Sequence, residues 1–211
     1  MSDVFTGQIL AAIVLLGTLA GGIAFVRSVS KNRARNAVRA RRKPAAWAEA
    51  VWPIGTIAIQ VWAVGVLVAP AWFYAWPGPL PLPWDHALQF AGIAVWAVGG
   101  FLVIWAGRTL GRFMVPEIRF EESHRLVREG PYRSIRHPTY TADVTMAVGL
   151  GLAFLHPALW AFALLLALTA RHRALLEEDL LRSPEAFGTE YDAYMTRTGR
   201  FLPKFRGRME R

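Results

Sequence analysis

The chain has 211 residues, of which 54% are hydrophobic and nine are Trp, and its formal net charge is +9. A soluble domain of this length cannot bury so much apolar surface, so composition excludes that class and favours an integral membrane protein of one domain. The sequence contains no Cys, which excludes disulfides and thiolate metal sites.

Apolar runs long enough to enter a bilayer follow one another along the chain. A transmembrane helix needs about 20 apolar residues. The runs are residues 8–26, 51–76, 87–107, 141–155 and 158–170. The last two are short, and Pro157 between them favours a tight helical hairpin over one long span. We therefore expect an all-α protein with about five transmembrane helices. Gly17, Gly21 and Gly22 of the first run offer a face for packing inside the chain or against a second copy.

Positive charge is distributed unevenly over the connections between these runs. The first connection, the third connection and the C-terminal tail are rich in Lys and Arg, whereas residues 70–86 contain neither. The positive-inside rule then places the N-terminus outside and the C-terminus in the cytosol. Because the basic residues flank membrane spans, we expect them to meet membrane lipid head groups and not nucleic acid. The first basic connection is expected to be a solvated surface.

Two polar clusters stand beside the last apolar runs. His124–Tyr140, HRLVREGPYRSIRHPTY, is basic and turn-rich, and it ends as the fourth run begins. Arg173–Asp179 closes the fifth run. Polar groups are costly at a membrane boundary, so both clusters suggest a functional site. Gly130 permits a turn that other residues resist, and Pro138 fixes the backbone before the fourth run. We expect the two clusters to converge on one pocket.

Arg173 and Glu177 are four residues apart and share one helix face. They form either a surface ion pair or a ligand site, in which the Arg holds an anionic acceptor by a forked hydrogen bond and the Glu pairs with a cationic ligand. Glu178 points to another part of the helix surface and is expected to matter less than Glu177. Asp179 is expected to be solvated.

His137 is open to three interpretations. As a metal ligand it lacks partners, since no His-x-x-x-His, no Cys and no carboxylate triad accompanies it, and we expect no metal. It can serve as a general base, or as a hydrogen-bonding wall of a pocket, which we favour. Tyr132 and Tyr140 are interface aromatics or ligand contacts, and His124 is a ligand contact or a loop residue exposed to water.

These segments resemble a known family. His124–Tyr140, the Arg-x-x-x-Glu-Glu sequence at Arg173, and FGTEYDAYMTRTGRFLP from Phe187 are similar to the isoprenylcysteine carboxyl methyltransferases and their bacterial relatives, as is WAGRTLGRF from Trp105. That family is related to the integral-membrane phospholipid N-methyltransferases. The resemblance divides the chain into membrane helices with a basic loop (1–98) and a methyltransferase core (99–211).

The resemblance implies S-adenosylmethionine as the cofactor, held in a cytosolic pocket that the C-terminal half forms and the C-terminal segment covers. It implies that Arg173 is the catalytic residue on the acceptor side. The implied cofactor-binding residues are His124, Leu126, Val127, Tyr132, His137, Pro138, Thr139, Tyr140 and Glu177. Ala142 stands where the family usually has Gly, and the extra methyl group could narrow the pocket. Asp143 has no counterpart in the family pattern.

The implied reaction is O-methylation of a carboxylate on a prenylated, isoprenoid or other lipid acceptor that enters from the bilayer, in a bacterial inner membrane. A carboxylate is ionised at neutral pH and needs no base. Three alternatives stay open: N-methylation of a lipid amine, an NADPH-dependent sterol or enone reductase, and a scaffold without activity. The reductases share an Arg-His-Pro-x-Tyr segment but typically continue it with Gly-Glu, unlike Thr141-Ala142-Asp143 here.

Overall fold

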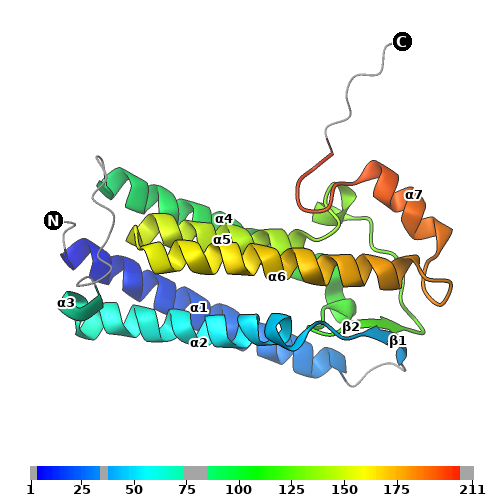
Figure 1. Ribbon diagram of the computed structural model, residues 1–211, viewed down its shortest axis with the longest axis horizontal. Helices are drawn as coiled ribbons and strands as arrows, with labels where there is room; N and C mark the ends of the chain where they lie inside the picture. The colour runs from blue at the N-terminus through cyan, green and yellow to red at the C-terminus, as the bar shows by residue number, and fades with distance from the viewer. Residues whose placement is uncertain (1–3, 34–37, 74–84, 205–211) are drawn as a thin grey trace, which may run out of the picture.

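A computed structural model describes residues 4–33, 38–73 and 85–204. Its long helices lie side by side in an elongated bundle, and α1 and α2 form a layer against α4, α5 and α6 (Figure 1). The elements in chain order are α1 (Val4–Arg33), β1 (Val38–Arg42), α2 (Ala46–Val68), α3 (Pro70–Phe73), α4 (Asp85–Leu110), η1 (Gly111–Phe113), β2 (Ile118–Glu121), η2 (Gly130–Arg133), α5 (Pro138–Phe154), α6 (Pro157–Arg182) and α7 (Thr189–Arg197).

The bundle has the dimensions and the surface of an integral membrane protein. Four helical segments are long and apolar enough to cross a bilayer: Gly7–Ser30, Ala46–Val68, His86–Phe113 and Pro157–Arg182. Large apolar side chains such as Leu16 and Phe101 are mostly exposed on the outer faces of these helices, as expected of a surface in contact with lipid. The predicted helical membrane fold is therefore confirmed. The remaining predicted span corresponds to α5, which has 17 residues, is about 25 Å long and is not among these four.

The last two predicted spans form the expected hairpin. Leu155 adopts a left-handed conformation with φ of 50° and ends α5. The side chain of His156 caps α6 by accepting a hydrogen bond from the Ala158 N–H at 3.2 Å, and Pro157 is the first helical residue. The helix then continues past the predicted end at residue 170 to Arg182, so the charged cluster belongs to the same rigid helix as the apolar span.

Close packing is concentrated between α4 and α5. A Cβ atom at Gly149 would lie 2.5 Å from the α4 backbone, and one at Gly99 would lie 2.9 Å from the α5 backbone. Small residues let two helix backbones approach in this way. The glycine face predicted in the first run is only partly used, because Gly17 packs against α4 whereas Gly21 and Gly22 face open space. The firm scaffold of the bundle is thus the α4–α5 pair.

A two-stranded antiparallel sheet accompanies the predicted helices. The basic segment after α1 forms β1, which pairs with β2 from Val38 opposite Glu121 to Arg42 opposite Ile118. All four residues of β2 are buried, and the ion pair between Arg119 and Glu121 (2.6 Å) is enclosed. A solvated loop was predicted here, since the run of Arg residues in β1 masks the alternation of exposed and half-buried positions.

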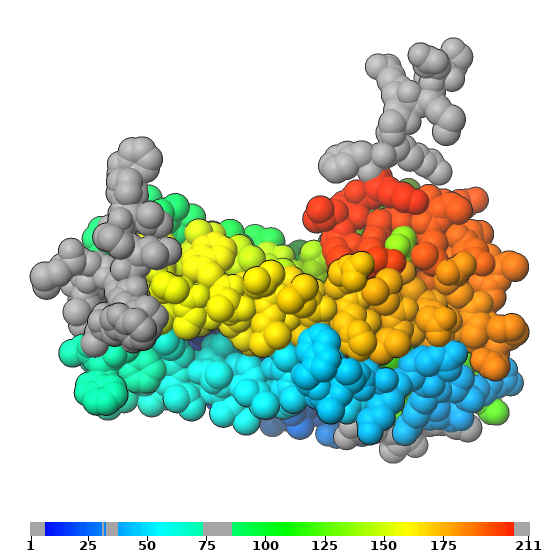
Figure 2. Space-filling model, viewed as in Figure 1, coloured from blue at the N-terminus to red at the C-terminus, as the bar shows by residue number. Residues whose placement is uncertain are grey.

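The charged elements share one end of the bundle. The β1–β2 sheet, η2, the charged half of α6 and α7 lie there, while α3 and the α5–α6 turn lie at the other end (Figure 1). In the space-filling view the C-terminal segment rests on the bundle at the charged end (Figure 2). Much of the neutral, Pro-rich connection, residues 74–84, lies outside the described residues.

Candidate active site

The loop before α5 and the C-terminal segment run alongside each other. Three backbone hydrogen bonds join them: Gly199 N–H to Ser134 O (3.0 Å), Arg136 N–H to Gly199 O (2.9 Å) and His137 N–H to Arg200 O (3.1 Å). The Thr141 hydroxyl adds a bond to the carbonyl of Phe201 at 2.9 Å. Residues 198–202 therefore cover the N-terminus of α5, and we refer to them below as the C-terminal strap.

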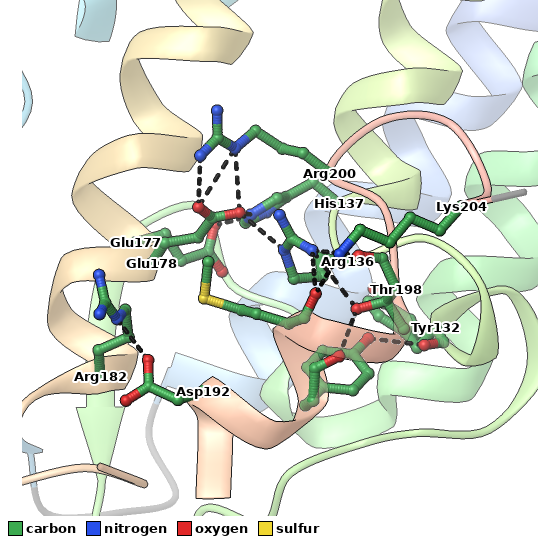
Figure 3. Close-up of polar contacts among 12 residues, drawn as sticks. Tyr132, Arg136, His137, Glu177, Glu178, Arg182, Asp192, Thr198, Arg200 and Lys204 are labelled. Carbon is green, nitrogen blue, oxygen red and sulfur yellow. Dashed lines mark hydrogen bonds and ion pairs between the residues drawn. The ribbon is translucent and has the colours of Figure 1, made fainter. Parts of the chain in front are cut away.

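Glu178 is the centre of the polar contacts beneath this strap (Figure 3). Its carboxylate accepts hydrogen bonds from Arg136 Nε at 2.9 Å and from Arg200 Nη2 at 2.7 Å, and His137 Nε2 lies 3.2 Å from Oε1. Its side chain is 5% exposed. The structure thus corrects the expectation that Glu178 points away from the site. Protein groups occupy the carboxylate. Through them it connects α6 to the loop before α5 and to the C-terminal strap.

Both ring nitrogens of His137 face carboxylates. Nδ1 lies 3.5 Å from Glu177 Oε2, and Nε2 faces Glu178. Two carboxylate partners require two N–H donors, which is the imidazolium form. Burial disfavours the charged ring, but the two hydrogen-bonded glutamates outweigh this effect and raise the pKa of His137 above its ordinary value. The raised pKa and the two carboxylate neighbours both favour the protonated ring, in which neither nitrogen can accept a proton.

Glu177 differs from its neighbour in having an open side. Its side chain is 35% exposed, and its described contacts are with His137 and Tyr140. The rings of His137 and Tyr140 stack with centroids 5.5 Å apart, so both hold Glu177 from the α5 side. One carboxylate edge is fixed by the protein, and the remainder is available to a ligand.

Arg173 is enclosed where α6 meets α2 and the loop before β2. The side chain donates a short hydrogen bond to the carbonyl of Pro116, and its guanidinium carbon lies 5.4 Å from the centre of the Trp52 ring. Tyr140 packs on the same indole at 5.7 Å and also interacts with Arg173. With 9% of the residue exposed, Arg173 is not half of a surface ion pair.

An apolar cavity of about 220 Å³ adjoins this cluster. It lies between α5 and α6 beneath the C-terminal strap. Its lining consists of Tyr140, Thr141, Val144, Thr145, Ala167, Ala170, Phe201 and Leu202. Tyr140 is common to the cavity and to the charged cluster, which places the two side by side. Ala142 is fully buried and lies outside this lining.

The predicted residues of the earlier loop lie on the α4 side of the site. The ring of His124 stacks on Phe113 at 4.4 Å, and its buried Nδ1 has no hydrogen-bond partner among the described residues. Burial lowers the pKa of His124, although nearby Glu residues oppose the change. Val127 and Tyr132 are buried in an apolar cluster with Phe113, and Leu126 is half-buried.

Backbone geometry explains the turns of this loop. Gly130 has a φ of 54°, and a Cβ atom there would lie 2.7 Å from the Thr109 hydroxyl of α4, so only glycine combines this conformation with this approach. Pro138 is buried as the first residue of α5, and Thr139 follows it half-buried. Both set the direction of the helix on which Tyr140 stands. The loop is further secured by the Tyr194 hydroxyl of α7, which donates to the Tyr132 carbonyl at 2.6 Å.

Sequence reasoning did not find two of the residues that complete the cluster. Arg200 lies inside the motif quoted from Phe187, but it was interpreted as one charge of a basic tail. Trp52 was one of nine tryptophans and had no distinguishing neighbour in sequence. Arg200 could have been found from its position in the motif that begins at Phe187, two residues after Thr198. No local sequence pattern distinguished Trp52 from the other tryptophans.

The cluster lies mostly within a segment that matches a known protein family. Residues 88–188 match the family model described as phospholipid methyltransferase. This part of the chain is similar to that family. It carries His124, the loop before α5, and both helices of the α5–α6 hairpin. Trp52 precedes the matched residues, and Arg200 follows them.

Curated relatives point in the same direction. The chain is 31% identical over 121 residues to proteins from Oryza sativa subsp. indica and subsp. japonica, each named "Probable protein-S-isoprenylcysteine O-methyltransferase". It is 33% identical over 102 residues to "Protein-S-isoprenylcysteine O-methyltransferase B" of Arabidopsis thaliana. The matches cover 55% and 48% of this chain and span 61% and 50% of those relatives.

Proposed function

We propose that this protein is a membrane methyltransferase that uses S-adenosylmethionine to methylate the carboxylate of a lipophilic acceptor. The observation that carries the proposal is the convergence of Arg173, His137, Tyr140 and Glu177 at the charged end of the bundle, beside an apolar cavity. This end also gathers the basic elements, and we propose that it faces the cytosol, where a soluble cofactor is available.

The chemistry of the residues present fits this cofactor. The open edge of Glu177 suits the amino group of its methionine part, and the stacked ring of His124, with its unpartnered Nδ1, suits the nucleoside. When bound, S-adenosylmethionine supplies a methyl group on a positively charged sulfur. His137 fixes the position of Glu177, because its Nδ1 faces that carboxylate while its other nitrogen is anchored on Glu178.

The acceptor is proposed to lie between Arg173 and the apolar cavity. A guanidinium can bind a carboxylate with two parallel hydrogen bonds, which fixes the direction of its oxygens. The cavity between α5 and α6 is lined mainly by apolar groups and suits part of a hydrocarbon chain that arrives laterally from lipid. The carboxylate of the acceptor then lies at Arg173, and its hydrocarbon chain lies in the adjoining apolar cavity.

Dry surroundings favour the transfer. A methyl group passing from a cationic sulfur to an anion neutralises both charges, and water stabilises the separated ions more than the transition state. The C-terminal strap and the burial of Arg173 exclude water from the reacting groups. Alignment of the two reactants adds further acceleration, which reaches about 7–11 kcal/mol in favourable systems.

The state of His137 favours a carboxylate acceptor over an amine. An ammonium group must lose a proton before it is methylated, which requires a base. His137 cannot serve as that base, since its two nitrogens already face carboxylates. N-methylation of a lipid amine remains the second candidate because the matching family model is that of phospholipid methyltransferases.

Ligand binding followed by turnover tests the proposal. We expect S-adenosylhomocysteine to raise the unfolding temperature of the purified protein in detergent, whereas NADPH should not. A ligand at 100 times its dissociation constant stabilises by about 2.7 kcal/mol. The protein should then methylate N-acetyl-S-farnesylcysteine and not phosphatidylethanolamine. Stabilisation by NADPH alone would indicate a reductase, and stabilisation by neither ligand would indicate a scaffold.

Substitutions assign the two roles. Glu177→Ala should weaken S-adenosylhomocysteine binding by about ten-fold, equivalent to about 1.4 kcal/mol, whereas Arg173→Ala should abolish methyl transfer with cofactor affinity retained. Asp179→Asn is a matched control on the same helix, because Asp179 is exposed and pairs with Arg42. Values like those of the unmodified protein in both the Glu177 and Arg173 variants would refute the assignment.

A further inference from the structure

An α2 residue reaches the candidate site from outside the family-matched segment. Trp52 precedes residue 88, where that match begins. Its indole nevertheless contacts Asp143 and Tyr140 of α5 and Arg173 of α6. The same side chain therefore joins three helices at the proposed acceptor side. A lipid-facing or purely space-filling tryptophan would not require polar partners on two of them.

Asp143 orients this indole. The carboxylate lies within apolar α5, where an ionisable group marks a functional position by default. Its Oδ2 accepts the Trp52 Nε1–H at 2.9 Å. Because the indole has a single N–H donor, this bond fixes the rotation of the ring as well as its position. Asp143 has no counterpart in the family pattern, and this hydrogen bond gives it the role of orienting the indole.

The oriented ring in turn holds Arg173. Its guanidinium carbon is 5.4 Å from the ring centre, within the distance of about 6 Å at which a cation is attracted to an aromatic face. The Pro116 carbonyl binds one Nη atom of the same guanidinium. The Pro116 hydrogen bond holds the edge of the planar guanidinium, and the Trp52 ring lies near its central carbon. Together the two contacts fix the orientation of the guanidinium plane. An Arg has five N–H donors, which leaves donors for an acceptor carboxylate.

We propose that Asp143 and Trp52 are positioning residues for the acceptor. Asp143 fixes the indole, and the indole fixes the guanidinium of Arg173 in the orientation that receives the acceptor carboxylate. This proposal rests on the proposed function, since that function assigns Arg173 to the acceptor. It extends the site into the N-terminal half of the chain, so that Trp52 of α2 contributes to acceptor affinity together with Asp143 and Arg173 of the family-matched helices.

Steady-state kinetics with N-acetyl-S-farnesylcysteine as the probe separates acceptor from cofactor effects. Trp52→Leu removes the ring and Asp143→Leu removes the hydrogen-bond acceptor. Both should raise the KM for the probe about ten-fold and leave the KM for S-adenosylmethionine unchanged. Asp143→Asn keeps an oxygen that can accept the indole N–H, so it should restore the KM of the unmodified protein.

Chemical modification gives a readout that does not depend on activity. Phenylglyoxal reacts with accessible Arg side chains, and peptide mass spectrometry measures its reaction at Arg173. We expect protection in the unmodified protein and in Asp143→Asn, and faster modification in Trp52→Leu. Trp62→Leu is the matched control, because Trp62 lies on the same helix but packs against Phe73 and His156. It should leave Arg173 protected and the probe KM unchanged.

The outcomes distinguish the two proposals. If the unmodified protein does not methylate the probe, the proposed function fails, and the protection of Arg173 still tests the positioning role. Equal exposure of Arg173 in the Trp52 and Trp62 variants would overturn that role. So would an Asp143→Asn variant as impaired as Asp143→Leu, since the negative charge and not the hydrogen bond would then be required.

Discussion

Glu177 and Glu178 are neighbours in sequence with unlike surroundings. They lie about 100° apart on α6, and the ring of His137 fits between them with one nitrogen toward each carboxylate. Glu178 is enclosed by Arg136 and Arg200, whereas Glu177 is partly open. Of the two adjacent glutamates, Glu178 can therefore hold the site together while Glu177 can bind a ligand.

Removing the charge of Glu178 should destabilise the protein. Glu178→Gln leaves buried Arg136 without its anion and His137 with Glu177 as its remaining carboxylate partner. Breaking a buried ion pair in this way costs about 3–5 kcal/mol. Glu177→Gln, its matched control, should change the free energy of unfolding by less than about 1 kcal/mol. Denaturant or thermal unfolding in detergent measures both. Equal losses in the two variants would contradict the distinction.

Stability should also depend on pH through His137. Its pKa is raised in the folded protein above the ordinary value of about 6.5. The folded state then binds the proton more tightly, so the stabilisation is complete below about pH 6.5 and is lost as pH rises through the folded pKa. The slope cannot exceed about 1.4 kcal/mol per pH unit for one proton.

The His137→Gln variant isolates this effect. We expect the difference in unfolding free energy between the two proteins to be largest near pH 6 and to shrink in alkaline buffer. A difference that stays constant over this range would show that His137 titrates elsewhere. A difference that grows with pH would show that the ring is held neutral in the folded state.

Part of the candidate site could be predicted from the sequence. Position along a helix brings Arg173 and Glu177 onto one face, and the apolar boundary at Tyr140 places the other cluster at the same depth. The role of Glu178 depends on where the ring of His137 lies and on a strap 22 residues farther along the chain. The role of Trp52 depends on the packing of α2 against α5 and α6. Such tertiary contacts leave no periodic signal.

At the level of whole elements, α4 and α5 set the spacing of the site. Their backbones meet at Gly99, where a Cβ atom would lie 2.6 Å from Met146 Cγ and 2.9 Å from the Ala142 carbonyl. Because α5 carries Tyr140 and begins directly after His137, any separation of the two helices would shift these side chains. Helix packing and site geometry are therefore coupled through one interface.

Two adjacent glycines of α4 test this coupling. Gly99→Val should destabilise the protein by about 1–3 kcal/mol, as overpacked interfaces do. Gly100→Val is the control, since a Cβ atom at Gly100 meets nothing within 4 Å, and it should have an effect within about 0.5 kcal/mol. Thermal unfolding in detergent compares them. A Gly100 variant as unstable as the Gly99 variant would contradict the packing argument.

The helices were more predictable than the sheet. Hydrophobic length located each long helix, and Pro157 indicated the hairpin. The ends were less accurate: α1 and α6 run well past their apolar segments, because a helix does not need to stop where the bilayer does. The β1–β2 pair was not predicted, since strand pairing joins segments separated by α2, α3, α4 and η1, and only the tertiary fold brings them together.

On the scale of the whole molecule, the position of charge predicts orientation. The chain has no Cys, so single Cys residues can be introduced without background labelling. Ala71→Cys lies on α3 and Ser123→Cys follows β2, and both positions are exposed at opposite ends of the bundle. In bacterial cells that express the variants, an impermeant maleimide should label Ala71→Cys from outside. Ser123→Cys should react only in inverted membrane vesicles, and the reverse pattern would overturn the proposed orientation.

The order of synthesis gives the C-terminal strap a further consequence. Proteins begin to fold from the N-terminus while the ribosome is still extending them, so the hairpin of α5 and α6 is made before residues 198–202 exist. Glu178 therefore forms its hydrogen bond with Arg200 only after the hairpin has been made. The loop before α5 likewise gains its backbone partners in the strap only then. A chain stopped after Arg197 would thus give a membrane-inserted bundle in which the candidate site is uncovered and open to water.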